Sequence, residues 1–466
     1  MYGTTDISTP NVDSLASTGI RFTNAHAVAA TSTPSRYGLL TGEYPFRKKG
    51  TDVAAGNAGM IISPNQFTLA DAFKQKGYAT AAIGKWHLGL GSKRGAQDWN
   101  STLDQSLDSI GFDYTYIMAA TADRVPCVFI ENNKVANYDS QSPIFVDYQR
   151  NFDGEPTGLT HPELLTKQRS SHGHNQSIVN GIGRIGYMKG GGKALWRDED
   201  IADSITTHAI QFIKTNKDSP FFLYFCTNDI HVPRQPHERF RGKSKMVLRG
   251  EAILQFDETV GRICQTLEEL NLSQNTLIIN TSNNGPVLDD GYEDGAIENV
   301  GTHLPGGPFR GGKYSNYEAG SIVPFIVAGP SVCAEAISTT NDCLISHIDF
   351  VSSLSAFIKA DLPDNCACDS ENHISSWLGI PHSPSRYAAL KMAHTHNVSI
   401  RTKDWKYIPP SQGPKLVPWG PKIETGSSTL KCPQKVGQVK HYPAMWSSLY
   451  FTGLIPFNLD LILLLL

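Results

Sequence analysis

Hydrophobic positions along the chain follow two patterns that alternate with each other. Continuous apolar runs, typical of strands covered on both faces, lie at 78–83, 221–225, 277–279 and 322–327. Helices, most of them marked by apolar residues every three or four positions, are predicted at 201–213, 253–270 and 345–358. Strands that alternate with helices of this length predict an α/β fold, with a mostly parallel sheet and helices on both of its faces.

Shorter elements precede the first apolar run. Thr9 and Pro10 have the pattern of a helix that carries proline at its first position, and Gly19 ends this helix. Residues 20–23 then predict a short strand. A second helix is predicted over 68–76, where a glycine follows.

Two regions lack this alternation. Residues 98–192 are irregular and rich in Gly, Asn and His, which predicts loops inserted over a site. Periodicity also weakens over 380–450, where proline increases. We therefore expect a catalytic α/β domain over 1–379 and a smaller C-terminal α+β subdomain over 380–450, followed by a tail over 451–466.

Both ends of the chain depart from the pattern of a complete secreted protein. Residues 1–3 lack the basic and apolar segments of a secretory signal. Residues 454–466 are apolar but shorter than the roughly 20 residues that a membrane span needs. We expect a sequence cut at its start and read out of frame at its end, which would make 451–466 an aberrant tail.

Composition sets few limits on function. The chain has 466 residues, a net charge of −3 and 18% charged residues, so neither nucleic acid nor an anionic membrane is indicated as a partner. Eight cysteines are scattered, and only Cys366 and Cys368 lie close together. This spacing predicts no zinc site and no disulfide framework.

The most informative stretch for chemistry is 32–42, which reads STPSRYGLLTG. Ser32 or Thr33 is placed to cap a helix whose first residue is Pro34. Ser32 should therefore lie near free backbone N–H groups at a helix N-terminus, where anions bind. Arg36, four residues further on, can reach back and offer a planar cation to an oxyanion.

Polar residues follow three of the predicted strands. They are Lys85 and His87 after the first, Asn228, Asp229 and His231 after the second, and Ser282, Asn283 and Asn284 after the third. Ligands of open α/β sheets bind beyond the carboxyl ends of the strands. We therefore expect these residues to converge on one crevice together with Ser32.

The stretch at Ser32 resembles the maturation motif of the type I sulfatases, Cys/Ser-x-Pro-Ser-Arg with a Leu-Thr-Gly close. In that family the first residue becomes formylglycine, and its hydrated aldehyde attacks sulfur. Because the residue here is serine, the resemblance implies the branch matured by a radical-SAM enzyme. The likeness extends from Tyr2 to about Tyr450 and implies the alkaline-phosphatase-like fold.

Further motifs carry the resemblance across the chain. The stretches concerned are 84–89 (GKWHLG), 231–233 (HVP), 276–286 (TLIINTSNNGP) and 310–315 (RGGKYS). They imply that Lys85 and Lys313 bind sulfate, that His87 holds the formylglycine hydrate, and that His231 faces the leaving group. The sequence is thus similar to bacterial glycan sulfatases and arylsulfatases, and the resemblance implies hydrolysis of a sulfate ester on a carbohydrate.

The chemistry of sulfate ester cleavage needs residues of these kinds. Negative charge grows on the sulfonyl oxygens and on the departing oxygen, so fixed cations are needed, and Arg36, Lys85 and Lys313 would provide them. His231 would give a proton to the leaving oxygen, and His87 would take one as sulfate departs. An unmodified serine would lack the second hydroxyl that expels sulfate.

Two departures from the family pattern concern calcium. The family holds Ca²⁺ with an Asp pair after its first strand, and that strand should lie before Met1. The later metal turn reads Asn283 and Asn284 here in place of Asp-Asn. Fewer carboxylates should weaken calcium binding, and Asp289 with Asp290 is more typical of a turn than of a replacement ligand.

A missing first strand also has a structural consequence. It would leave unpaired strand edges in the middle of a parallel sheet. We therefore expect this chain to fold poorly and to hydrolyse little.

The substrate and two rival functions stay open at this stage. His172 and His174, in the long irregular region, line either a sugar subsite or a solvated lid. The resemblance favours a sulfate ester of galactose or N-acetylgalactosamine and a periplasmic or extracellular location. The rivals are a phosphoryl-transfer relative that uses Ser32 directly, and a non-catalytic glycan-binding protein derived from a sulfatase.

Overall fold

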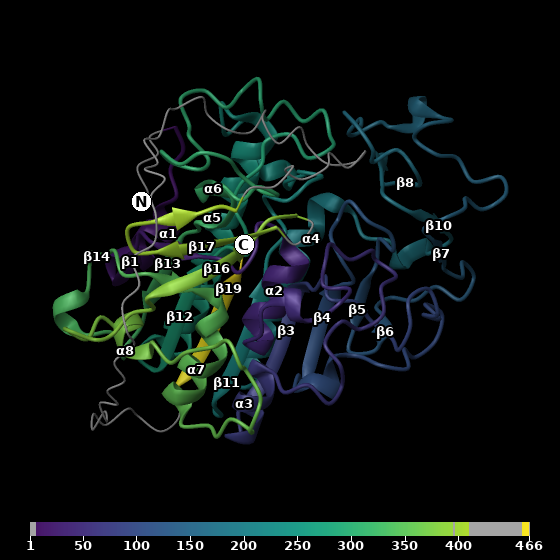
Figure 1. Ribbon diagram of the computed structural model, residues 1–466. Coiled ribbons are helices and arrows are strands. Elements are labelled where there is room, and N and C mark those ends of the chain that lie inside the picture. The colour runs from purple at the N-terminus through teal and green to yellow at the C-terminus, as the bar shows by residue number, and fades with distance from the viewer. Residues whose placement is uncertain (1–5, 395–396, 410–458, 466) are drawn as a thin grey trace.

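The centre of the fold is a mixed sheet of ten strands, shown by a computed structural model that describes residues 6–394, 397–409 and 459–465 (Figure 1). In spatial order the strands are β14 (Thr339–Asn341), β1 (Gly19–Phe22), β13 (Phe325–Ala328), β12 (Thr276–Thr281), β19 (Asp460–Leu465), β11 (Phe221–Cys226), β3 (Ala79–Lys85), β4 (Tyr114–Met118), β5 (Phe129–Glu131) and β6 (Lys134–Val135). The five central strands from β12 to β4 are parallel to one another. β13 is antiparallel to β12, and β5 is antiparallel to β4. The predicted α/β class is confirmed.

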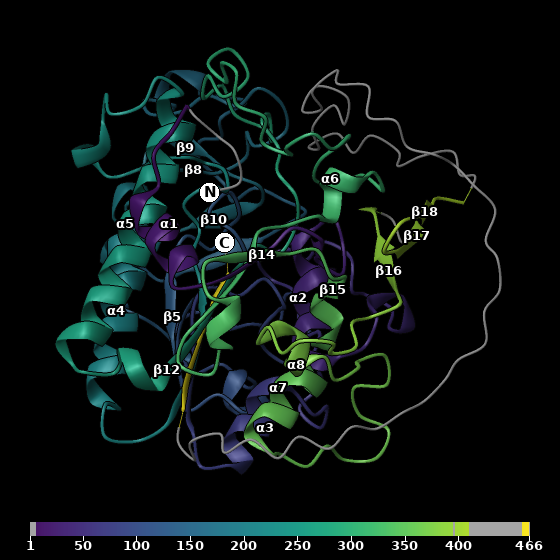
Figure 2. The same ribbon diagram turned by 90° about the vertical axis from the view of Figure 1, so that its left-hand side faces the viewer.

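Helices cover both faces of the sheet (Figure 2). One face carries α1 (Pro10–Ser17), α4 (Ile201–Thr215) and α5 (Val247–Glu269). The other carries α2 (Ser32–Thr41), α3 (Leu69–Gln75), α7 (Phe350–Ile358) and the short α8 (Ile374–Trp377). The three segments predicted as helices from 201 onward correspond to α4, α5 and α7, and the repeating apolar residues of α4 are buried as expected.

The inserted region differs from the prediction of loops alone. β4, β5 and β6 continue the main sheet, while β7 (Phe145–Asp147) pairs with β10 (Tyr187–Lys189) and β8 (Ile178–Val179) with β9 (Ile182–Gly183). Figure 1 shows β7, β8 and β10 projecting beyond that end of the sheet. Strands of two to five residues are too short to show a period in the sequence, which explains why they were not predicted.

Strand β19 corrects the expectation of an open gap in the sheet. Its six residues are all buried, and it pairs in parallel with β11 on one side and with β12 on the other. Part of the stretch that was expected to be an aberrant tail therefore closes the middle of the sheet, in yellow in Figure 1. A run of leucines is suited to this place because a central parallel strand is covered on both faces.

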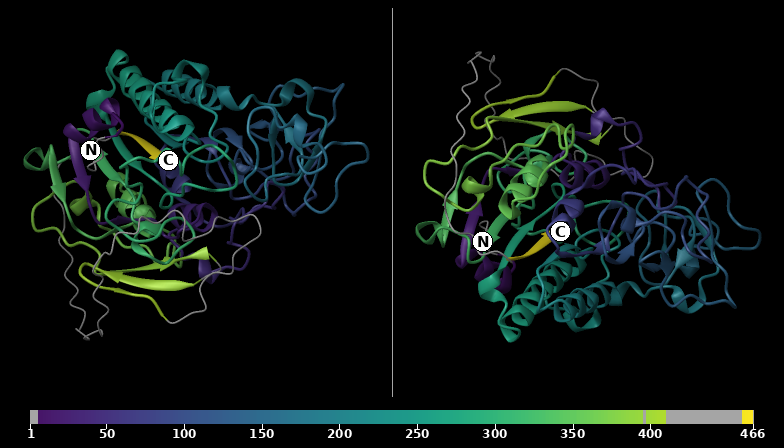
Figure 3. Two further views of the ribbon diagram at one scale, coloured as in Figure 1. Left: turned by 90° about the horizontal axis from the view of Figure 1, so that it is seen from above. Right: turned by 90° about the horizontal axis from the view of Figure 1, so that it is seen from below.

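A second, smaller sheet follows the main one along the chain. β16 (Ala388–Met392), β17 (Val398–Thr402) and β18 (Lys406–Tyr407) are antiparallel, and Figure 3 shows them on the side of the main sheet opposite α4 and α5. The described structure also contains the pair β2 (Ala25–His26) and β15 (Ile345–Ser346), the short helix α6 (Glu318–Ser321) and several 3₁₀ turns.

The small sheet lies in the predicted C-terminal subdomain, although the domain boundaries stay a prediction and residues 410–450 lie outside the described residues. Among the helices that the structure describes, none is long and apolar enough to cross a membrane.

Candidate active site

Helix α2 places Ser32 beside the carboxyl ends of the parallel strands. Ser32 is the first helical residue and Thr31, in extended conformation, precedes it. Pro34 is thus the third residue of the helix, and no side chain caps it, so the expectation of a Ser32 or Thr33 cap is wrong. Both hydroxyls bond to other segments instead. Gly42, with a φ of 66°, ends the helix in the left-handed conformation.

The hydroxyl oxygen of Ser32 is held by three residues from two distant segments of the chain. Lys85 Nζ, at the end of β3, donates to Ser32 Oγ at 2.8 Å. Asn283 Nδ2, just beyond β12, donates to the same oxygen at 3.2 Å, and the hydroxyl itself donates to Asn284 Oδ1 at 3.3 Å. Ser32, Lys85 and the two asparagines therefore converge as the sequence predicted.

Lys85 is buried, and among the described residues no carboxylate forms an ion pair with its amino group. Burial, Arg36 and Lys313 together hold the pKa of Lys85 well below its usual range, and Asp123 offsets this only in part. A negatively charged ligand beside Lys85 would relieve this repulsion. The surroundings of Ser32 Oγ therefore suit an anion.

His87 lies two residues beyond Lys85, with an unusual backbone. Its φ of 61° is in the left-handed region, and its Nε2 lies 2.9 Å from the carbonyl oxygen of Ala54. Nδ1 is buried and has no hydrogen-bond partner among the residues that the structure describes. Burial and the neighbouring Arg124 and Lys85 hold the pKa of His87 well below its usual range, so the ring is neutral with Nδ1 as its acceptor.

Arg36 supports the site from inside the protein. Its Nη1 donates to the carbonyl oxygen of Lys85 at 2.9 Å and lies 3.4 Å from the hydroxyl of Tyr224. Arg36 is completely buried, and no hydrogen bond joins it to Ser32 in the described structure. The guanidinium group thus fixes the strand end that carries Lys85.

Lys313 and His231 form a second pair. Lys313 Nζ lies 3.2 Å from His231 Nε2 and donates to Asp290 Oδ2 at 2.6 Å. His231 Nδ1 faces the carbonyl oxygen of Val232 at 2.8 Å. Burial, Lys313 and Lys85 hold the pKa of His231 well below its usual range.

Asp290 corrects the interpretation of the two neighbouring aspartates as a turn. It is buried, it also accepts a hydrogen bond from the Tyr314 hydroxyl at 2.9 Å, and the charge of Lys313 lowers its pKa. Asp289 does accept the turn hydrogen bond from the backbone of Gly291. Only Asp289 therefore behaves as a turn residue.

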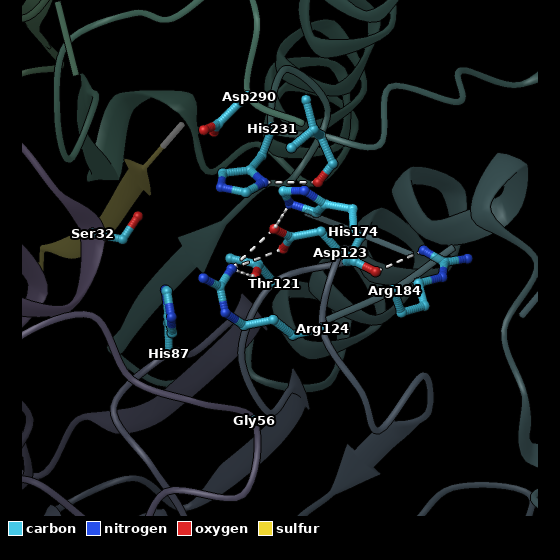
Figure 4. Close-up of polar contacts among 12 residues, drawn as sticks. Ser32, Gly56, His87, Thr121, Asp123, Arg124, His174, Arg184, His231 and Asp290 are labelled. Carbon is cyan, nitrogen blue, oxygen red and sulfur yellow. Dashed lines mark hydrogen bonds and ion pairs between the residues drawn. The ribbon is translucent and has the colours of Figure 1, made fainter. Parts of the chain in front are cut away.

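Asp123 and Arg124, two buried charged residues that the sequence did not single out, lie together with His174 in the site (Figure 4). Arg124 Nη1 contacts both carboxylate oxygens of Asp123 at 3.0 and 3.1 Å, and His174 Nε2 lies 3.0 Å from Asp123 Oδ2. Asp123 and Arg124 follow β4, which the sequence did not predict, so their position at a strand end was not visible. His174 was predicted as a substrate residue, and the structure places it behind Asp123.

The two histidines of the inserted region have different positions. His174 Nδ1 also faces the carbonyl oxygen of His172 at 3.0 Å, which leaves His174 buried and bonded at both nitrogens. His172 is partly exposed and lies 3.8 Å from Asp289 Oδ1. Only His172 is therefore at the rim of the site.

A cavity of about 200 Å³ opens beside these residues. Among the residues that line it are Lys85, Asp229, His231, Arg249, Asn283 and Lys313. Both lysines of the predicted sulfate site face this cavity, so it is the natural place for an anionic group.

The described residues do not fit the calcium ion that the resemblance implies. Asn283 and Asn284 use amide atoms to bond Ser32 Oγ. Nowhere in 6–394, 397–409 and 459–465 do three or more His, Cys, Asp or Glu residues form a group that could hold a metal ion. Calcium prefers six to eight oxygen ligands, largely carboxylates, and the described residues do not offer such a set.

Comparisons with known proteins identify the family of this chain. The sequence matches the Sulfatase family over residues 1–359. It is 49% identical to an N-acetylgalactosamine-6-O-sulfatase of Bacteroides thetaiotaomicron over 91% of this chain and 82% of that protein, and 28% identical to human steryl-sulfatase over 80% and 65%. A solved sulfatase structure from glycosaminoglycan metabolism of Bacteroides thetaiotaomicron has a TM-score of 0.87 at 49% identity, covering 91% of this chain and 87% of the other. Matches of this extent show that the chain belongs to the sulfatase family, whose members are sulfuric ester hydrolases.

Proposed function

We propose that this sulfatase is of the serine type and releases sulfate from a sulfated glycan, with formylglycine made from Ser32 as its nucleophile. The observation that supports this most is the hydrogen bonding of Ser32 Oγ by Lys85 and Asn283 at the first residue of a helix. A hydrated aldehyde at this position would supply one hydroxyl to attack sulfur and a second to expel sulfate.

Lys85 and Lys313 are the cations that we assign to the sulfate group. They line the same cavity, and each lowers the pKa of His231. Fixed cations stabilise the charge that develops on the sulfonyl oxygens as the S–O bond breaks. Arg36 acts through the backbone of Lys85 and keeps that ammonium group in place.

His231 is the residue that we assign to the leaving group. Its Nε2 faces Lys313 Nζ, so a proton source stands beside the ring. The ring is neutral without substrate because burial and two lysines lower its pKa. A sulfate ester between the lysines offsets their charge and favours the protonated ring, which then gives its proton to the departing sugar oxygen.

His87 acts when sulfate is released from the enzyme. Because Nε2 is bonded to Ala54, Nδ1 is the nitrogen that takes the proton of the second hydroxyl at position 32. As that O–H bond breaks, the carbonyl of residue 32 forms again. The bond from its carbon to the sulfate oxygen breaks, and sulfate leaves with the electron pair.

The sugar that we propose is a sulfated galactose or N-acetylgalactosamine. The 49% identical protein from Bacteroides thetaiotaomicron is an N-acetylgalactosamine-6-O-sulfatase. Asp123 and Arg124 offer a buried acceptor and donor for sugar hydroxyls, His174 holds Asp123, and His172 lies at the rim. Such buried polar groups discriminate strongly between sugars because a mismatched hydroxyl leaves them unpaired.

Mass spectrometry of the protein from an anaerobic host tests the proposal. Trypsin should release residues 22–36, and oxidised Ser32 makes this peptide lighter by two hydrogens. Protein that carries the modification should release sulfate from 6-sulfated N-acetylgalactosamine and much less from its C4 epimer, 6-sulfated N-acetylglucosamine. A Ser32→Ala variant is the control, and an unmodified Ser32 in active protein would overturn the proposed nucleophile.

The proposed function implies a maturation enzyme and a cellular location. A radical-SAM maturase is the enzyme that we expect to oxidise Ser32, and the glycan substrate implies a periplasmic or extracellular site of action. A phosphoryl-transfer function is disfavoured because two metal clusters would be needed, and the described residues contain none.

The rival of a glycan-binding protein without catalysis is favoured by one observation, the lack of metal ligands among the described residues. Binding of the sulfated sugar without any sulfate release would support that rival.

A further inference from the structure

Thr33 joins three segments of the active site through one hydroxyl group. Thr33 Oγ1 donates to the carbonyl oxygen of His87 at 3.0 Å and accepts from the backbone N–H of Ala54 at 3.1 Å. His87 Nε2 in turn contacts the carbonyl oxygen of Ala54 at 2.9 Å. These contacts form a closed ring that links the start of α2, the turn after β3 and the loop at Ala54.

This closed set of hydrogen bonds holds His87, whose backbone conformation is unfavourable. A φ of 61° is unfavourable for a side chain larger than glycine and persists only when neighbouring contacts hold it. Thr33 bonds the carbonyl of His87 directly and is completely buried, so water does not compete for this contact.

The same contacts select the form of the imidazole ring. Because the Ala54 carbonyl accepts only, Nε2 of the neutral ring must carry the hydrogen, and Nδ1 keeps its lone pair. The Thr33 hydroxyl accepts a hydrogen bond from the backbone N–H of Ala54. It therefore anchors the loop whose Ala54 carbonyl selects the tautomer of His87.

We propose that Thr33 is a positioning residue, whose hydroxyl holds His87 with Nε2 protonated and Nδ1 directed at the group on residue 32. The inference rests on the proposed function, since His87 is the base only in that mechanism. Thr33 does not touch the substrate and acts through His87 and Ala54.

Two substitutions separate the hydroxyl from the volume of the side chain. Thr33→Val keeps the shape and removes both hydrogen bonds, whereas Thr33→Ser keeps the hydroxyl. Thr41→Val is a matched control in the same helix, because the buried Thr41 hydroxyl bonds the carbonyl oxygen of Tyr37 at 2.7 Å and not the site.

The first readout does not need activity. Long-range ¹H–¹⁵N spectra of histidine-labelled protein, assigned with a His87→Gln variant, report which ring nitrogen carries the hydrogen. We expect the Nε2–H form of His87 in the wild-type protein, in T33S and in the control variant T41V. In T33V we expect a mixture of the two forms.

The second readout is the kinetics of oxidised protein with a 6-sulfated N-acetylgalactosamine glycan. T33V should lower kcat by about tenfold or more, as loss of an oriented base does, with little change in KM. T33S should restore kcat. The proposal would be overturned if T33V had the same His87 spectra and the same kcat as the wild type. Inactive wild-type protein with the expected spectra would overturn the proposed function but not the positioning by Thr33.

Discussion

At the scale of single residues, the site is built from cations that lack enough anions. Lys85, Lys313, Arg36 and Arg124 are all buried around it. Asp123 and Asp290 balance part of this charge, and both have lowered pKa values because cations surround them. A site with this excess is prepared for a negatively charged ligand.

Asp290→Asn tests this charge balance. We expect the free energy of unfolding to fall by about 3–5 kcal/mol, since the change leaves Lys313 buried without its carboxylate. The stabilisation from added sulfate should be larger in the variant, because sulfate replaces the lost charge. Denaturant unfolding with and without sulfate measures both effects.

The pH dependence of the stability difference and the variant Asp289→Asn are the controls for Asp290→Asn. Because its pKa is lowered in the folded state, the advantage of the wild type should hold above the unfolded pKa of about 4 and disappear as the pH falls below it. Asp289→Asn, which removes a partly exposed contact with His172, should cost less than about 1 kcal/mol. Equal losses in the two variants would contradict the assignment.

The residue scale also shows where the sequence was informative. Lys85 and Asn283 could be placed near Ser32 because each follows an apolar run long enough to identify as a strand. Asp123 and Arg124 follow a five-residue strand in an irregular region, so nothing in the sequence placed them at the sheet edge. The contacts of Thr33 depend on loop geometry, which no periodicity reveals.

At the scale of elements, β19 is the main difference between expectation and structure. After Asp460 the strand consists of leucine and isoleucine, yet its position at the end of the chain favoured an interpretation as an aberrant tail. The neighbours β11 and β12 were predicted correctly, but the strand between them depends on pairing partners more than a hundred residues away, which a local pattern does not identify.

Asp460 gives a prediction for β19. Its carboxylate is buried at the start of the strand, accepts from the backbone N–H of Phe221 at 3.1 Å, and has a pKa raised to about 7 by burial. A raised pKa means that wild-type stability falls as the pH rises from about 4 towards 7, because the unfolded state ionises first. Asp460→Asn should remove this loss.

Thermal unfolding from pH 5 to pH 8 measures the effect. The stability of Asp460→Asn relative to the wild type should increase over this range, since the amide keeps the acceptor without the charge. Asp108→Asn, on an exposed residue outside β19, is the control and should follow the wild type. A constant difference between Asp460→Asn and the wild type would show that Asp460 is not the group that titrates.

At the scale of the whole molecule, ion pairs with a buried carboxylate fasten the small sheet to α6. Glu318 in α6 accepts from Arg401 Nε at 2.9 Å, and Lys406 Nζ lies 3.1 Å from its other oxygen. His26 of β2 lies 3.5 Å from the same carboxylate. Because Glu318 follows Lys313 by five residues along the chain, the small sheet helps to hold the segment that carries this lysine.

Calcium dependence is the prediction that belongs to the whole molecule. The described residues offer no group of carboxylates for calcium, so we expect a dissociation constant weaker than about 1 mM. At 1 mM calcium the stabilisation would then stay below about 0.4 kcal/mol. Thermal unfolding in calcium and in chelator should give the same midpoint, and a rise of several degrees in calcium would contradict this.

The place of β19 bears on how the polypeptide is made. β11 and β12 leave the ribosome long before β19 does, so the nascent chain carries two half-sheets with unsatisfied inner edges. Unpaired edges of this kind pair readily with other extended apolar peptides, so aggregation before β19 inserts is the hazard of this topology. The cavity of the candidate site takes residues from both half-sheets, and β19 is the strand that joins those halves into one sheet.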